Sequence, residues 1–299
     1  MKRFWLALVL FPATLVYASP CGGHGARDTV FVSTSWLAHS LKDPHLVVLA
    51  IGDQKEYQQE HIPGSVFFEF RDVQAPVAAG GLMLQLPEMS VLAANFAKYG
   101  VSNDSRIVLY RLSSASTQTA RVYMTLDAMG LGAQTSILDG NMAVWKGEAR
   151  PATTETPQFS PGKLEPCPAD DVIADLDYVK SHLKKAGVSI VDARAPQFYS
   201  GAESRAPFAA GHIPGAANLF FNTLFNDQGQ LKSTAELEKA FAAAGISRGD
   251  LVVTYCFIGQ QASALYAVSR YLGYDTRLYD GSMDEWGHHP ELPVEKAGK

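Results

Sequence analysis

The sequence predicts an α/β protein with two similar domains, each built on a mostly parallel sheet flanked by helices. An internal repeat is the first reason, because His61-Ile-Pro-Gly-Ser recurs as His212-Ile-Pro-Gly-Ala. A second repeat follows in the same order, since Leu138-Asp-Gly-Asn-Met-Ala-Val-Trp145 returns as Tyr279-Asp-Gly-Ser-Met-Asp-Glu-Trp286. Between these motifs, short apolar runs alternate with helical patterns, which is typical of a parallel sheet covered on both faces. Repetition of the whole series indicates two copies of one unit.

The chain of 299 residues divides into four parts. Residues 1–18 have the pattern of a secretory signal, the two copies occupy residues 28–152 and 170–299, and residues 153–169 join them. This length suits two domains. The joining segment contains four prolines, so we expect an extended, semi-rigid linker.

The first segment has the three regions of an export signal. Lys2 and Arg3 carry positive charge, and residues 4–16 are apolar but too short to span a bilayer. Val16-Tyr17-Ala18 then offers small residues for cleavage. We therefore predict a periplasmic or secreted protein that has no stable membrane insertion once the signal is removed.

Each copy alternates strands and helices. In the first copy, the apolar run at 107–110 precedes a helix that ends at Gly130. Ser233 and Glu236 form a capping box at a helix start in the second copy. There we expect, in order, a strand at 189–192, a helix at 234–244, a strand at 251–255, a helix from 262 to Gly273 and a strand at 276–279. Ligands of such sheets bind beyond the carboxyl ends of the strands.

Charge and motif content exclude several functional classes. The formal net charge is −5 and no basic stripe is present, which argues against nucleic-acid binding. The sequence contains no zinc-type spacing of Cys and His, no P-loop and no Gly-x-Gly-x-x-Gly. We expect no nucleic-acid partner, no metal and no organic cofactor.

Cys256 follows the apolar strand at 251–255 and precedes a helix. Backbone N–H groups at a helix start point toward this place, and the helix dipole favours negative charge there. This setting predicts a lowered thiol pKa and a nucleophilic thiolate. The alternative is that Cys256 is a small buried hydrophobic residue, the usual role of a lone cysteine.

The chain has three cysteines, an odd number. One interpretation is that Cys21 and Cys167 pair in an oxidising compartment and leave Cys256 free. The alternative, in which Cys21 and Cys167 both stay unpaired, remains open on the sequence alone.

These features together resemble the tandem-domain rhodaneses, which are sulfurtransferases. The resemblance covers almost all of the chain after the signal. It rests on the two His-Ile-Pro-Gly motifs, Asp192-Ala-Arg194, the Cys256 loop that closes on Gly259, and Asp280-Gly-Ser282 with Trp286. It implies that the cysteine takes a sulfane sulfur from a small anionic donor, becomes a persulfide, and gives the sulfur to cyanide or a thiol. The cysteine then carries the transferred group itself.

The same resemblance assigns roles in the second copy. Cys256 is expected to be the catalytic nucleophile, and Arg194 is expected to bind the anionic donor. The loop residues Phe257, Ile258, Gly259, Gln260 and Gln261 are expected to surround the bound sulfur, with backbone N–H groups as far as Ala262 directed at its negative charge. Asp192 is expected to order the site, His212 to be structural, and Trp286 to pack in the core.

The first copy lacks the residues for this chemistry. Alignment on Gly130 and Gly273 places Ser113 opposite Cys256, and a serine without a base is a weak nucleophile. Ala50 and Gly52 stand opposite Asp192 and Arg194. The first copy is therefore predicted to be inactive and structural, and to cover the site of the second.

The loop Cys256-Phe-Ile-Gly departs from two patterns of the family. Thiosulfate enzymes often carry Cys-Arg-Lys-Gly, and mercaptopyruvate enzymes often carry Cys-Gly-Ser-Gly. A second arginine that clamps a carboxylate in the family is Gln197 here, and Arg205, in an insertion, is a candidate substitute. We expect thiosulfate as donor, with 3-mercaptopyruvate or a polysulfide as the alternative.

Three other functions compete with sulfur transfer. A persulfide-binding protein with little turnover is compatible with the same residues. A cysteine phosphatase of this fold needs an arginine where Ala262 stands, so it is disfavoured. A serine hydrolase acting at Ser113 lacks the Gly-x-Ser-x-Gly elbow.

Overall fold

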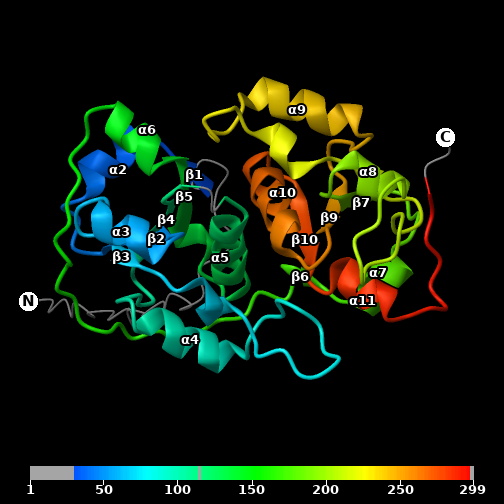
Figure 1. Cartoon of the computed structure of the whole chain (residues 1–299), viewed down its shortest axis with the longest axis horizontal. Helices are drawn as coiled ribbons and strands as arrows, with labels where there is room; N and C mark the ends of the chain where they lie inside the picture. The colour runs from blue at the N-terminus through cyan, green and yellow to red at the C-terminus, as the bar shows by residue number, and fades with distance from the viewer. Residues whose placement is uncertain (1–29, 114–115, 297–299) are drawn as a thin grey trace, which may run out of the picture.

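The structure is a computed structural model, and it describes residues 30–113 and 116–296 (Figure 1). The first domain contains β1 (Phe31–Val32), α2 (Thr34–Ser40), β2 (Leu46–Ile51), α3 (Gln54–Gln59), β3 (Val66–Phe67), the 3-10 helix η1 (Phe70–Val73), α4 (Met89–Ala97), β4 (Arg106–Arg111), α5 (Ser116–Ala128), η2 (Gly132–Gln134), β5 (Thr135–Asn141) and α6 (Met142–Gly147). The second contains β6 (Ile173–Ala174), α7 (Leu176–Ser181), β7 (Val188–Asp192), α8 (Pro196–Ser200), β8 (Ala217–Asn218), η3 (Phe221–Leu224), α9 (Thr234–Ala243), β9 (Leu251–Tyr255), α10 (Gln260–Tyr271), β10 (Asp275–Tyr279) and α11 (Ser282–Gly287).

Each domain has one five-stranded sheet in which every pair of strands is parallel. The strand order is β1-β5-β4-β2-β3 in the first domain and β6-β10-β9-β7-β8 in the second. The two orders are equivalent, so the repeated motifs do mark two copies of one fold. The predicted α/β class is confirmed.

The strands and helices that the sequence predicted are present, whereas the other elements, among them β2, α4 and the short edge strands, were not predicted. The strand β9 has its predicted bounds, and β7 begins one residue earlier. The capping box of Ser233 and Glu236 is present at the start of α9. The edge strands β1, β3, β6 and β8 have two residues each, which is too short for a periodic pattern.

The two His-Ile-Pro-Gly motifs form matching turns beneath their sheets. A tyrosine at the end of the central strand holds each turn: Tyr110 Oη accepts from Ile62 N at 3.3 Å, and Tyr255 Oη accepts from Ile213 N at 3.1 Å. His212 stacks on Tyr199 with ring centroids 3.8 Å apart. This contact gives His212 a structural place in the turn.

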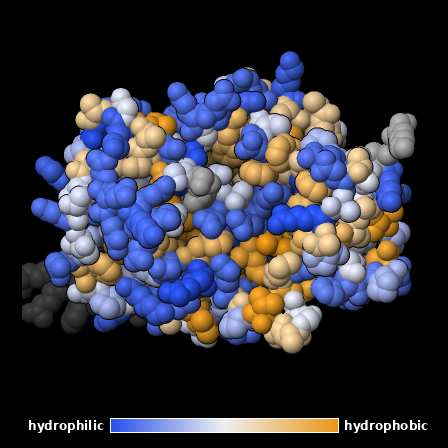
Figure 2. Space-filling model, viewed as in Figure 1, coloured by the Kyte–Doolittle hydropathy of each residue, from blue (hydrophilic) through white to orange (hydrophobic). Residues whose placement is uncertain are grey.

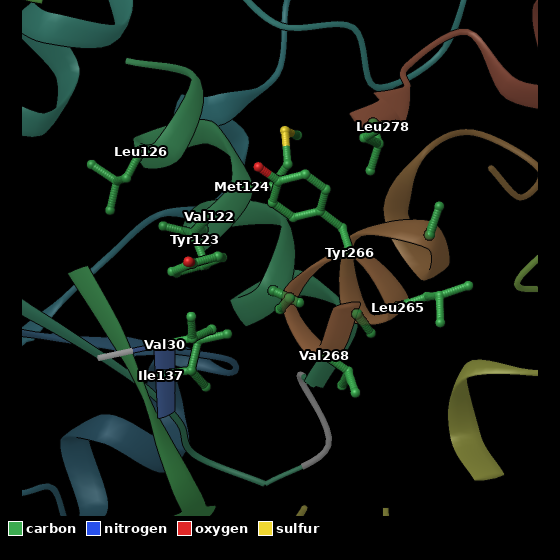
Figure 3. Packing of buried hydrophobic residues seen from close by; sticks show 14 of the residues in the cluster. Val30, Val122, Tyr123, Met124, Leu126, Ile137, Leu265, Tyr266, Val268 and Leu278 are labelled. Atoms are coloured by element: carbon green, nitrogen blue, oxygen red, sulfur yellow. The ribbon is translucent and has the colours of Figure 1, made fainter. Parts of the chain in front are cut away.

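The helices α5 and α10 lie side by side at the centre of the molecule (Figure 1). Their facing side chains belong to one hydrophobic core that spans both domains, as Figure 3 shows for Val122, Tyr123, Leu265 and Tyr266. The buried Tyr266 hydroxyl also donates to Asp127 across this interface, at 2.6 Å. Because the two domains share an interior, groups of the first can contribute directly to a site in the second.

The segment 153–169 follows the outer edge of the first domain instead of standing free (Figure 1). Gly162 N donates to Ala97 O at 2.8 Å, and Cys167 N donates to Met129 O at 3.0 Å. Cys167 is disulfide-bonded, whereas Cys256 is a free cysteine. Cys21, its expected partner, lies outside the described residues, as does the predicted signal at 1–18. Within 30–113 and 116–296, no helix is both long and apolar enough to cross a membrane.

A loop of residues 74–88, called the crossing loop here, leaves the first domain and reaches the second (cyan in Figure 1). Apolar side chains gather on its surface (Figure 2), where Val77 is 58% exposed. Met83 N donates to the Asp284 carboxylate at 2.7 Å, and Leu86 N donates to Asp280 at 3.3 Å. The crossing loop is thereby fixed to the segment that follows β10.

Candidate active site

Cys256 directly follows β9, at the carboxyl end of the sheet, and is fully buried. Its backbone is held by the segment after β10. The N–H of Cys256 donates to Ser282 Oγ at 3.2 Å, and its carbonyl accepts from Met283 N at 3.1 Å. The cysteine is therefore positioned by the second repeated motif as well as by its own strand.

Burial and loop amides act on the thiol in opposite directions. Burial raises the pKa of the Cys256 thiol, and the nearby charge of Asp192 adds to this effect. The backbone N–H groups of Ala262, Ile258 and Gln261 are directed at the sulfur and lower its pKa. The net pKa is raised, so the prediction of a lowered pKa was wrong. The helix-start amides are present as expected, but desolvation of the anion outweighs them.

The raised pKa predicts the pH dependence of Cys256 reactivity. A thiol whose pKa is raised stays protonated at neutral pH, so its thiolate fraction continues to grow above the ordinary value of about 8.5. The rate of alkylation by iodoacetamide, followed by mass spectrometry with Cys256→Ser as control, should still rise above that pH. If the alkylation rate levels off below pH 7, the loop amides lower the pKa of the thiol by more than burial raises it.

Gly259 permits the tight turn between Cys256 and α10. Its φ is +81°, a left-handed conformation that favours glycine. A Cβ here would also stand 2.8 Å from Arg121 Nη1 and 3.1 Å from the carbonyl oxygen of Asp280. The loop thus needs glycine for its backbone angle and for close contact with a residue of the first domain.

Arg121 of α5 is that residue, and its side chain is 0% exposed. Nη1 donates to Asp280 Oδ1 at 2.5 Å, and Nη2 donates to the carbonyl of Leu84 in the crossing loop at 2.6 Å. We call Arg121, Asp280 and Leu84 the interdomain clamp. It joins both domains directly beneath the Cys256 loop.

Arg194 makes a buried ion pair with Asp192. Its Nε lies 2.9 and 3.0 Å from the two carboxylate oxygens, and its Nη2 donates to Asp192 Oδ2 and to Gly211 O, each at 2.6 Å. The guanidinium carbon also lies 4.9 Å from the centroid of the Phe257 ring. Arg194 is thus close to the cysteine loop, but Asp192 already takes two of its nitrogens.

A cleft of about 420 Å³ opens above Cys256. The predicted loop residues Phe257, Ile258, Gln260 and Gln261 line it, and Gly259 shapes the turn. The remaining walls are formed by Met83, Thr117, Arg205, Ala206, Pro207, Phe208 and Phe221. Gln260 Nε2 donates to Thr117 Oγ1 of the first domain at 2.9 Å, so this domain supplies part of the wall.

The first domain has a different residue at the position of the cysteine. Sheet register pairs Ala50 with Tyr110 and Asp192 with Tyr255, so Arg111, not Ser113, takes the place of Cys256 along the strand. Alignment from the helix ends missed this because α5 is one residue longer than α10, with 13 residues against 12, and the segment between the paired tyrosine and the helix is also one residue longer in the first domain. Arg111 Nη2 donates to Gly229 O of the second domain at 2.8 Å. The first domain therefore has no thiol at this position, as predicted. Arg111, which occupies it, contacts the second domain.

Comparison with known proteins identifies the family of the chain. The family described as the Rhodanese-like domain matches residues 33–148 and 175–289. The chain belongs to this rhodanese-like family. It is 32% identical over 287 residues to the "Sulfur carrier protein TtuD" of Thermus thermophilus, covering 91% of this chain and 98% of that one. It is 30% identical to a "Thiosulfate sulfurtransferase" of Pseudomonas aeruginosa, covering 88% and 96%.

A solved rhodanese-like structure agrees with these relatives. SseA from Escherichia coli, described among 3-mercaptopyruvate sulfotransferases, superposes with a TM-score of 0.72 at 25% identity, over 85% of this chain and 98% of that one. The expected tandem rhodanese-like fold and the sulfurtransferase class of the enzyme are therefore confirmed. In this family, sulfur transfer proceeds through a cysteine persulfide.

The sequence did not identify the first-domain residues of the site. Arg121, Met83 and Thr117 reach the cleft region only because α5 and the crossing loop pack against the second domain. One feature of the structure marks Arg121: it is a charged residue on a helix whose residues 119–128 are all buried. Such a charge is rarely found without a partner.

Proposed function

We propose that this protein is a thiosulfate sulfurtransferase that carries the transferred sulfur on Cys256. One observation supports this most directly: a free cysteine lines a cleft, and three backbone N–H groups of its loop and of the first turn of α10 are directed at its sulfur. Those donors suit the negative charge of a persulfide. The sulfur is held covalently by the protein itself, and we propose that no other cofactor takes part.

The proposed reaction is a double displacement. The Cys256 thiolate attacks the outer sulfur of thiosulfate, a new S–S bond forms, the old one breaks, and sulfite leaves with its electron pair. The persulfide now carries the negative charge that the thiolate had, in the same amide environment. Cyanide or a thiolate then attacks the terminal sulfur and releases the Cys256 thiolate. Cys256 is fully buried, and the low local dielectric strengthens each amide contact with its sulfur.

The donor is the finer part of the proposal. The Cys256-Phe-Ile-Gly loop carries neither cation nor hydroxyl, so a proton relay through the loop has no residue to use. We therefore favour thiosulfate over 3-mercaptopyruvate. A polysulfide donor, or persulfide carriage with little turnover, is the second candidate, because the rim formed by Phe257 and Ile258 is apolar.

Thiocyanate formation from cyanide tests this function. Purified protein should turn over with thiosulfate and more slowly with 3-mercaptopyruvate. A preference for 3-mercaptopyruvate would show that the missing loop groups were weighted wrongly. No turnover with either donor, from protein whose Cys256 is readily alkylated, would favour the persulfide carrier.

We also propose that the protein is exported, on the basis of the charged and apolar pattern of residues 1–18. The mass and N-terminal sequence of the protein from cell fractions test this. A chain that starts after Ala18 in the periplasm or medium is expected, and a full-length chain in the cytoplasm would contradict it.

A further inference from the structure

A hairpin of the second domain reaches the first domain near the place that corresponds to the Cys256 loop. This exchanged hairpin, residues 225–231, follows η3 and precedes α9 (yellow, beside α9 in Figure 1). Its two ends, Phe225 and Leu231, pair as an antiparallel bridge, and Asn226 Oδ1 accepts from two backbone N–H groups of the turn, at 3.0 and 2.9 Å. The exchanged hairpin is therefore a defined turn and not a loose connection.

Arg111 and Asp139 of the first domain hold the exchanged hairpin. Arg111 Nη2 donates to Gly229 O at 2.8 Å, and Asp139 Oδ1 accepts from Leu231 N at 2.7 Å. Phe225 lines one small cavity together with Arg111 and Asp139. Burial raises the pKa of the Asp139 carboxyl, whereas the Leu231 N–H and the charge of Arg111 lower it, so both contacts favour the charged form of Asp139.

The first domain makes the same contact in return. The repeated Asp-Gly motif supplies Asp139 in the first domain and Asp280 in the second. Leu86 N of the crossing loop donates to Asp280 Oδ2 at 3.3 Å, which is the counterpart of the Leu231 bond to the first domain. Leu86 and Leu231 each stand three residues before the helix that follows, α4 and α9. Each domain thus extends one loop to the Asp-Gly motif of the other.

The helix η3 connects the exchanged hairpin to the Cys256 cleft. Phe221, its first residue, lines the cleft, whereas Asn222, its second, lines a separate groove beside the hairpin. Phe221 N also donates to the carbonyl of Ala193, the residue before Arg194, at 3.2 Å. η3 has only four residues, and the hairpin follows it directly. A shift of the hairpin would therefore move Phe221 in the wall of the cleft.

We propose that Asp139 is a positioning residue for sulfur transfer. Together with Arg111 it fixes the exchanged hairpin, and the hairpin keeps Phe221 in the wall of the Cys256 cleft. The crossing loop has the matching role from the first domain, since its Met83 lines the same cleft. The first domain thus acts on the reaction through its own Asp-Gly motif, although it carries no thiol. The inference rests on the proposed sulfurtransferase function.

Asp139→Ala removes the acceptor for Leu231 N. With thiosulfate and cyanide as substrates, kcat/KM should fall by about 10-fold, because a hydrogen bond to a charged acceptor is lost. Asp139→Asn keeps an acceptor oxygen at the same place and should recover most of the loss. An unchanged kcat/KM in Asp139→Ala would overturn the proposal, as would an equal loss in the two variants.

The Phe221→Ala background shows whether Asp139 acts through Phe221. Independent residues have additive effects on the free energy, whereas residues that act through one another do not. Asp139→Ala should therefore change kcat/KM by less than about 2-fold when residue 221 is already alanine. An undiminished loss in that background would mean that Asp139 supports the fold in general, and it would refute the positioning role.

Gly229→Ala disturbs the same contact from the hairpin and leaves the first domain unchanged. A Cβ at Gly229 would overlap Nη2 of Arg111. The matched control is Gly245→Ala, because the two glycines have similar φ values of +72° and +81°. A Cβ at Gly245, however, would meet no atom of the described residues within 4 Å, its chain neighbours apart. Turnover should fall in Gly229→Ala and stay within about 2-fold of the original in Gly245→Ala. Equal losses would assign the effect to backbone strain and refute the contact with Arg111.

Hydrogen exchange separates this inference from the function on which it rests. Asp139→Ala should speed amide exchange in the peptides that contain Phe221 and Leu231. Faster exchange without any change in turnover would leave the sulfurtransferase function intact and refute the positioning role. If the original protein forms no thiocyanate with thiosulfate or with 3-mercaptopyruvate, the proposed function is refuted, and the role of Asp139 in transfer with it.

Discussion

Cys256→Ser is expected to lose sulfur transfer by at least about 1,000-fold, with every donor. A serine hydroxyl at this position can accept the same loop amides, but it cannot form the S–S bond on which the transferred sulfur is carried. Its pKa also leaves it protonated in a buried site whose thiol is already hard to ionise. The measurement is thiocyanate formation, together with mass spectrometry of the protein after incubation with donor and no acceptor.

The mass measurement distinguishes lost chemistry from lost folding. The original protein should gain the mass of one sulfur atom, and Cys256→Ser should gain none while keeping the thermal unfolding midpoint within a few degrees. Ser113→Ala is the control in the first domain, because Ser113 lies in the strand-to-helix loop that the sequence alignment placed opposite the Cys256 loop. Activity retained by Cys256→Ser would refute the persulfide mechanism, and a large loss in Ser113→Ala would mean that the first domain takes part in the chemistry.

The fold was predictable because its signals are local and duplicated. The strand β9 is an apolar, β-branched run, α9 begins with a capping box, and the His-Ile-Pro-Gly turns appear twice in the same order. The two-residue edge strands gave no such signal. They exist because β2, β5, β7 and β10 offer unpaired edges, and that is a property of the assembled sheet.

The site was predictable only in part, for two physical reasons. The position of Cys256 follows from its strand and helix. The sign of its pKa shift depends on how completely the assembled fold buries it, and no local sequence pattern encodes that. The second case is the positively charged side chain expected to bind the anionic sulfur donor. Arg194 has the expected place in the sequence, yet the nearest carboxylate, Asp192, pairs with it, whereas Arg205 of an inserted loop lines the cleft.

The first domain matters to the site through Arg121. Its guanidinium is fully buried between Asp280 and the crossing loop, and the Asp280 side chain is 11% exposed, so neither charge is well solvated. Removal of one partner of such a pair leaves an uncompensated charge, which typically costs about 3–5 kcal/mol. We therefore expect Arg121→Met to lower the free energy of unfolding by about that amount, and to reduce turnover because Gly259 and Asp280 lose the group they pack against.

A double-mutant cycle tests whether the pair itself is responsible. Asp280→Asn removes the charge but keeps an acceptor for the N–H of Leu86, so Arg121→Met combined with Asp280→Asn should be more stable than Arg121→Met alone. Urea unfolding followed by tryptophan fluorescence reports the stabilities, and thiocyanate formation reports the site. Effects that simply add would mean that Arg121 acts by packing alone. A coupling of 1 kcal/mol or more, on the order seen for contacting residues, together with partial recovery of turnover, would mean that a charge pair across the domain interface sets the geometry of the Cys256 loop.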